Sequence, residues 1–177
     1  KFYNREADVL NLINCNNGIF ANNMIIATDA SQWSSAVSFK AGSGINFINN
    51  SINSINSNEY AIVVKMEDMS SPFFTNTNKF WNNIIVNKGL GYAMSSLAGQ
   101  MSLRNNAYYA TGNFFARVYD KDVRTLDEWK TIFVGDTGSV FVDPNFFTDR
   151  DLHTRNFLLN NAGKDVSALI QDDYDHE

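Results

Sequence analysis

The sequence of 177 residues has little cysteine, little proline and few basic residues. Its single cysteine, Cys15, excludes an intramolecular disulfide, and with no histidine nearby in the sequence it reads as a small apolar side chain on a strand. The formal net charge of −5 argues against nucleic-acid binding, which needs an excess of basic residues to contact phosphates. No apolar run approaches the roughly 20 residues of a spanning helix. We therefore expect neither nucleic-acid binding nor membrane insertion.

Asparagine is the abundant residue, with 25 copies against ten glycines and two prolines. Its side chain tolerates left-handed backbone and can form ladders between stacked strands. Four Asn-Asn pairs recur between apolar residues, at spacings of 27, 33 and 23 residues: Asn22-Asn23, Asn49-Asn50, Asn82-Asn83 and Asn105-Asn106. These spacings are typical of repeats in which each unit stacks on the last, so they predict a solenoid.

The apolar segments of residues 8–118 are rich in Ile, Val, Phe and Tyr, which favours strands over helices. Apolar and polar residues alternate over 45–49 and 52–56, as in strands with one face in a core. We expect strands at 8–14, 18–28, 36–39, 45–55, 60–66, 79–86 and 101–109. The longest interval between Asn pairs contains the polar and aromatic segment 67–76, which we expect to protrude as a loop.

The pattern changes after residue 118. Thr125 followed by Glu128 has the spacing of a capping box, which predicts a short helix beginning there. A turn, a strand and a stop follow over 135–147, and the remainder is loop-rich and acidic. We therefore expect one structural domain, with coils over 1–118 and, over 119–177, a cap made of a short helix, a final strand and an acidic tail. Trp129 and Phe146-Phe147 should close the end of the stack.

Motifs in roughly the last 80 residues resemble the C-terminal end of bacterial right-handed parallel β-helix proteins of the pectate-lyase-like class. The segments that carry the resemblance are Asn105–Tyr109, Leu126–Trp129, Gly138–Phe146, Asp151–His153 and Asn161–Asp165. The resemblance implies an all-β right-handed parallel β-helix with a short C-terminal helix and a loop-rich cap. It also implies an extracellular or bacterial cell-surface location.

Two stretches depart from the family's pattern. Residues 156–160 lack the small residues and proline that usually precede the Asn-Ala-Gly segment. The acidic residues 172–177 look like the start of a turn that continues in the family. We therefore expect a fragment of a longer chain, with neighbouring parts of the parent chain among its partners.

Charged residues near the long middle interval are the candidates for catalysis. A polysaccharide lyase needs a basic group to remove a proton and a cation to stabilise the developing charge, and a hydrolase needs two carboxylates across a cleft. Glu67 and Asp68 are adjacent and would point to opposite faces of a strand. Such charges more commonly solvate the outside of a coil, so these residues are weak candidates: Lys65, Glu67, Asp68, Lys79 and Arg104.

Aromatic residues could stack on sugar rings, although core packing is their commoner fate. The candidates are Phe73, Trp81, Tyr108 and Tyr109, with Phe74 and Tyr92 as further members of the group. The acidic residues between 143 and 175 offer oxygen ligands for calcium, but their spacing matches no known calcium repeat. We therefore predict no metal site and no cofactor, with calcium a weak alternative.

Two classes of function remain open. The first is a non-catalytic terminal part of an extracellular or cell-surface β-helix, structural or adhesive, whose partner is a polysaccharide or surface glycan. The alternative is a polysaccharide lyase or glycoside hydrolase of the pectate-lyase-like class, and a trimeric phage-type fibre is a weaker third. Convergence of Lys65, Lys79 and Arg104 on one groove with a carboxylate would favour the enzyme.

Overall fold

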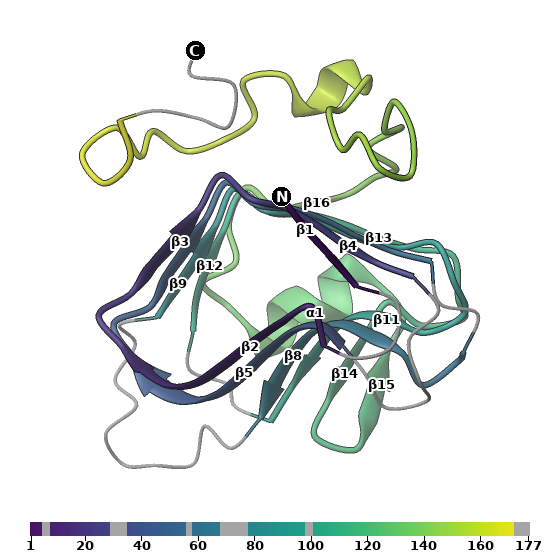
Figure 1. Cartoon of the computed structure of the whole chain (residues 1–177). Helices are drawn as coiled ribbons and strands as arrows, with labels where there is room; N and C mark the ends of the chain where they lie inside the picture. The colour runs from purple at the N-terminus through teal and green to yellow at the C-terminus, as the bar shows by residue number, and fades with distance from the viewer. Residues whose placement is uncertain (5–7, 29–34, 56–57, 68–77, 98–100, 172–177) are drawn as a thin grey trace.

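The computed structural model describes residues 1–4, 8–28, 35–55, 58–67, 78–97 and 101–171. Within them the protein is mostly β, with mainly parallel strands in three sheets and one short α-helix (Figure 1). Sheet A contains β1 (Phe2–Asn4), β4 (Met24–Ala27), β7 (Ser51–Ser54), β10 (Ile84–Asn87), β13 (Ala107–Ala110) and β16 (Val140–Phe141). Sheet B contains β2 (Leu10–Asn16), β5 (Ser35–Ser43), β8 (Ile62–Glu67), β11 (Tyr92–Ser96), β14 (Ala116–Val118) and β15 (Lys121–Val123). Sheet C contains β3 (Ile19–Ala21), β6 (Asn46–Ile48), β9 (Lys79–Trp81) and β12 (Ser102–Arg104).

The chain visits sheets B, C and A in turn, and we call each such pass a coil. Paired strands are therefore three apart in chain order, for example β4, β7 and β10 in sheet A. The described pairs are parallel except for β14 with β15, where the chain turns back. Figure 1 shows the three sheets around a common interior, with α1 (Leu126–Ile132) at the end of the stack farthest from β2.

The interior is filled by one apolar cluster to which all three sheets contribute. Phe47 and Phe80 are register partners in sheet C, and Phe39 from sheet B meets both rings, with centroid distances of 5.2 and 5.0 Å. Alternate residues along each strand point inward, as expected for a sheet with one face in a core. Cys15 lies half-buried on β2 and packs against this cluster.

The strand predictions need two corrections: they missed the strands β1, β11, β14 and β15, and they joined two strands into one at every Asn-Asn pair. The segments 18–28, 45–55, 79–86 and 101–109 are each two strands rather than one, because the Asn pair turns the chain from sheet C into sheet A. The first Asn of each pair has a positive φ, between 51° and 59°: Asn22, Asn49, Asn82 and Asn105. Asparagine adopts this left-handed conformation more readily than other non-glycine residues. Most of the predicted loop 67–76 lies outside the described residues.

The predicted capping box is confirmed. The Thr125 hydroxyl oxygen accepts a hydrogen bond from the Glu128 backbone N–H at 3.2 Å, and the Glu128 carboxylate accepts one from the Thr125 N–H at 3.3 Å. This reciprocal pair satisfies two N–H groups at the start of α1. The helix in turn places the Trp129 ring against Phe133, with centroids 4.2 Å apart, in the interior at the end of the stack.

Phe146 and Phe147 do not close the end of the stack with Trp129, contrary to the sequence prediction. Phe146 instead packs on the outer face of sheet A, in a second cluster with Met24, Ile26, Val86 and Leu152. Phe147 is exposed. The physical reason is that the outer face of sheet A is itself apolar, so the chain after β16 crosses that face and covers it.

Trp129→Ala tests the role of the buried indole. Trp129 is fully buried, so we expect its removal to lower the free energy of unfolding by about 3–5 kcal/mol through lost burial and a residual cavity. Ile132→Ala on the same helix is the matched control, because Ile132 is 40% exposed. Urea unfolding measures both variants. A loss of less than about 1 kcal/mol for Trp129→Ala would contradict a structural role for this side chain.

Candidate functional site

The second Asn of each pair forms a hydrogen-bonded ladder along the corner between sheets C and A. The backbone N–H groups of Asn50 and Asn83 each donate to the side-chain oxygen of the next rung, at 3.0 and 2.9 Å. The side-chain amides of the same residues donate to those oxygens as well, both at 3.1 Å. Asn23 begins the ladder by donating to Asn50 at 3.1 Å, and Asn106 ends it by donating to the Ser139 hydroxyl at 2.9 Å.

The ladder connects to a buried carboxylate at the end of the stack. Ser139 donates its hydroxyl hydrogen to Asp136. Asp136 also accepts hydrogen bonds from the Trp129 indole N–H at 2.9 Å and from the Tyr108 hydroxyl at 3.1 Å. Burial raises the pKa of Asp136, while these three donors act in the opposite direction. The last corner is therefore held by a polar network in an otherwise apolar end.

The first Asn of each pair points outward and forms an outer row. Asn82 donates to the Asn49 side-chain oxygen at 3.0 Å. We call the described segment after β16, residues 142–171, the tail. Asn82 holds the tail through two hydrogen bonds with Lys164: its side-chain amide donates to the Lys164 carbonyl, and its side-chain oxygen accepts from the Lys164 N–H, both at 2.8 Å. Asn105 adds a bond to the carbonyl of Ala162 at 3.0 Å. Gly163 lies so close to Asn82 that a Cβ there would be 3.2 Å from the side-chain amide.

The tail is also fixed at the C-terminal ends of β7 and β10 in sheet A, away from the Asn corner. Asn53 donates to the Asp149 carbonyl at 3.2 Å, and Lys88 forms a salt bridge with the Asp149 carboxylate at 3.0 Å. Phe146, just before this anchor, and Leu152, just after it, cover the outer apolar cluster. The tail passes over sheet A as an arch attached at both ends (Figure 1).

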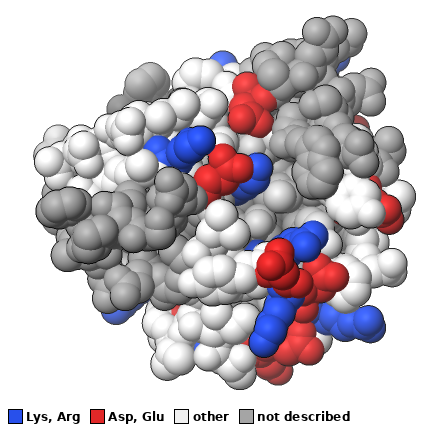
Figure 2. All heavy atoms as spheres, turned by 90° about the horizontal axis from the view of Figure 1, so that it is seen from below, with Lys and Arg blue, Asp and Glu red and all other residues white. Residues whose placement is uncertain are grey.

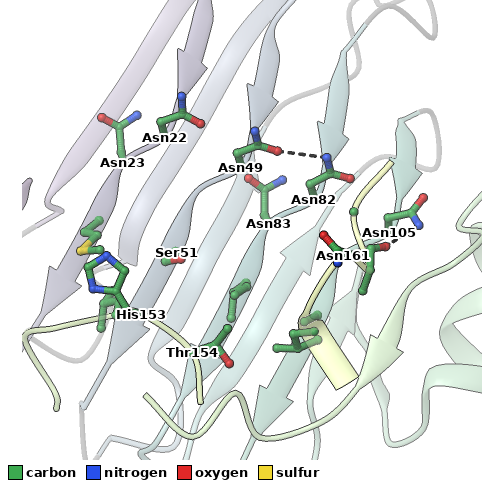
Figure 3. A pocket seen from close by; sticks show the side chains of 17 residues that line it. Asn22, Asn23, Asn49, Ser51, Asn82, Asn83, Asn105, His153, Thr154 and Asn161 are labelled. Atoms are coloured by element: carbon green, nitrogen blue, oxygen red, sulfur yellow. Dashed lines mark hydrogen bonds between the residues drawn. The ribbon is translucent and has the colours of Figure 1, made fainter. Parts of the chain in front are cut away.

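A groove of about 530 Å³ lies between this arch and the Asn corner. Figure 3 shows the outer Asn row along one side and His153 and Thr154 on the other, with Ser51 between them. Its polar lining is mostly carboxamides, and Met24, Ile84, Leu152 and Leu159 add apolar surface. Carboxamides donate and accept hydrogen bonds at once, so they suit ligands rich in hydroxyl groups.

His153 is the one titratable side chain among the described residues that line the groove. Its ring nitrogen Nδ1 is hydrogen-bonded to the Asp151 carboxylate. The hydrogen bond from the His153 side chain, with a second from its backbone N–H, lowers the pKa of Asp151. The Asp151 carboxylate thus orients the imidazole at the edge of the groove.

Two of the five predicted catalytic candidates lie together, on the outer face of sheet C. Lys79 Nζ is 5.1 Å and Arg104 Cζ is 5.9 Å from the centroid of the Trp81 ring. Lys164 Nζ, from the tail, lies 4.3 Å from the same centroid. Sequence reasoning placed Lys79, Arg104 and Trp81 among the candidates and missed Lys164.

Lys65 and Glu67 lie elsewhere, on β8 of sheet B, and form a salt bridge with each other. Figure 2 shows this side of the molecule, where blue and red side chains lie against one another rather than in separate patches. The convergence of Lys65 with Lys79 and Arg104, which would have favoured an enzyme, is not present because the residues belong to different sheets. Asp68 lies outside the described residues.

The aromatic candidates divide by burial. Tyr108 is fully buried and bonded to Asp136, so its proposed contact with sugar is withdrawn as a correction: its ring fills the core. Tyr109 is half-buried and packs against Phe141 at a centroid distance of 5.9 Å. Tyr92 is buried, with its hydroxyl bonded to Asp122 at 2.9 Å. Trp81 remains, and Phe73 and Phe74 lie outside the described residues.

Comparison with protein-family models, with curated proteins and with solved structures gave no match for this chain. Within the described residues, no three His, Cys, Asp or Glu side chains are grouped so that they could hold a metal ion. The same part of the chain contains no helix that is long and apolar enough to cross a membrane.

Gly163→Val tests whether the tail depends on its close approach to Asn82. The added side chain would push the tail off the corner, so we expect the Lys164 amide, now bonded to Asn82, to exchange its hydrogen about tenfold faster. Gly135→Val is the control, since nothing lies within 4 Å of a Cβ at Gly135. Hydrogen exchange followed by NMR measures both. An unchanged Lys164 rate in Gly163→Val would show that the corner does not hold the tail.

Proposed function

We propose that this chain is a terminal part of a right-handed parallel β-helix of the pectate-lyase-like class, on a bacterial cell surface or outside the cell, and that it binds glycans without catalysis. The order of strands supports the architecture, because each sheet takes one strand from each coil. The Asn ladder also supports it, because stacked coils with equivalent corners bring identical side chains into line. The motifs in the tail suggest the class.

The observation that carries the binding proposal is the composition of the groove under the tail. Asn49 and Asn161 present amides along it, while Ile84 and Leu159 present apolar surface. A saccharide is likewise both polar and apolar, with hydroxyl groups around the edge of each ring and C–H groups on its faces. The volume of about 530 Å³ lies in the range of small-molecule pockets, and it suits a short saccharide segment.

Catalysis in this groove has little support. Cleavage of a glycosidic bond needs an acid and a base or nucleophile at the scissile bond. Of the described lining residues only His153 titrates, and none is a carboxylate. Glu67 is already paired with Lys65 on another sheet. The lyase or hydrolase is therefore the second candidate, and we propose that binding needs no metal or cofactor.

A glycan array followed by calorimetry with any oligosaccharide found tests the proposal. Ser51→Phe should fill the groove and weaken binding about tenfold, because Ser51 lines its floor on β7. Asn11→Phe is the control, on an exposed position of β2 in sheet B. EDTA should leave the affinity unchanged.

Three results would contradict the proposal. The first is a wild-type protein that binds no glycan on the array, and the second is a Ser51→Phe variant that binds as tightly as wild type while melting at the same temperature. Release of unsaturated or hydrolysed product from the bound oligosaccharide would establish the enzyme instead.

A further inference from the structure

Three cationic side chains surround one tryptophan on the outer face of sheet C, and we call Lys79, Arg104, Lys164 and Trp81 the cation cluster. Each charged group lies 5.9 Å or less from the centroid of the Trp81 ring. The three charges therefore lie within about one Debye length of each other, where exposed like charges still repel. Among the described residues, none of the three forms a salt bridge.

The fold fixes the positions of all three. Arg104 is the register partner of Trp81 on the neighbouring strand, and Lys79 precedes Trp81 by two residues and so shares its face. The Trp81 indole N–H donates to the Ser102 hydroxyl at 3.0 Å, which sets the orientation of the ring. Lys164 comes from the tail, 82 residues after Asn82, and is held by its two backbone bonds to that side chain.

Three of the other described cations are paired with acids: Lys65 with Glu67, Lys88 with Asp149 and Arg117 with Asp120. The protein carries a net charge of −5, so acidic partners are plentiful. The indole attracts each cation through its negative ring face, but this attraction is small at exposed positions. A cluster of unpaired cations in an acidic protein is therefore an anion site by its electrostatics.

We propose that the cation cluster binds the charged group, a sulfate ester or a carboxylate, of an acidic glycan whose saccharide chain lies in the groove. The groove and the cluster are adjacent, because two residues that line the groove are sequence neighbours of cluster residues. Asn82 follows Trp81, and Gly163 precedes Lys164. A saccharide chain leaving the groove past Asn49, beside the point where the tail is bound to Asn82, brings its acidic substituent to the cluster. Arg104 supplies a planar fork that matches either oxyanion, and the two lysines supply point charges.

This inference rests on the proposed glycan binding, and its experiment separates the two. Calorimetry compares three oligosaccharides of equal length: a neutral one, one with carboxylates and one with sulfate esters. We expect one of the acidic compounds to bind about tenfold tighter than the neutral one at low salt, with the difference shrinking as salt rises. The tighter of the two acidic compounds identifies the charged group.

Charge-removing variants locate the effect. Arg104→Gln and Lys164→Gln should each remove most of the advantage of the acidic compound and leave the affinity for the neutral one unchanged. Lys65→Gln is the control, because it removes the same charge from sheet B. Ser51→Phe should weaken the neutral and the acidic compounds alike.

Two outcomes would overturn the cation cluster as a glycan site. Equal binding of neutral and acidic compounds, with the Gln variants like wild type, would leave the groove as the glycan site and exclude the cluster. Binding of single-stranded DNA of the same charge as tightly as the best acidic glycan would show attraction for any polyanion. Loss of glycan binding in every arm, including wild type, would instead contradict the proposed function itself.

Discussion

The asparagine ladder at the corner between sheets C and A is the interaction on which the rest of the structure depends. At each corner a two-residue turn leaves a buried backbone N–H with no partner in either sheet, and such a group is costly unless it is bonded. The side-chain oxygen of the next rung supplies that partner, as at Asn50 and Asn83. One residue type in one position thus closes the turn and aligns one coil on the next.

The tail depends on this corner in turn. Because the second Asn of each pair is committed to the ladder, the first one points outward, where Asn82 and Asn105 bind the backbone of the tail. The apolar outer face of sheet A provides the second reason for the tail to lie there, through Phe146 and Leu152. The groove and the cation cluster are both consequences: the groove lies between the corner and the tail, and Lys164 of the tail completes the cluster on the outer face of sheet C.

Local features of the fold could be predicted from the sequence. The repeated Asn pairs indicated stacked parallel strands because they recur at the spacing of a coil, and Thr125 with Glu128 indicated the helix start because a capping box spans only four residues. The breaks inside the strand segments were missed: an Asn flanked by apolar residues reads as part of a strand until its left-handed φ is known. Tyr108 was misassigned because a sequence does not show which face of a strand its aromatic residues occupy.

The candidate site could be predicted only in part. Lys79 and Arg104 were found as charged residues near the long middle interval, and Trp81 was found as an aromatic residue that could stack on a sugar ring. Lys164 and His153 belong to a tail that returns across sheet A, and no local pattern reports a contact between residues 82 positions apart. The sequence feature that comes closest to indicating this contact is Gly163, because a glycine lets the tail backbone approach Asn82 closely.

Native-state hydrogen exchange at the corner tests the central claim most directly. The backbone amides of Asn50, Asn83 and Asn106 lie in turns, where amides ordinarily exchange quickly. If the ladder holds the stack together, they should exchange as slowly as those of Ile52 and Ile85 in sheet A, only through global unfolding. Exchange as fast as at the exposed Gly135 would show that the corners open independently, and the ladder would not be what aligns the coils.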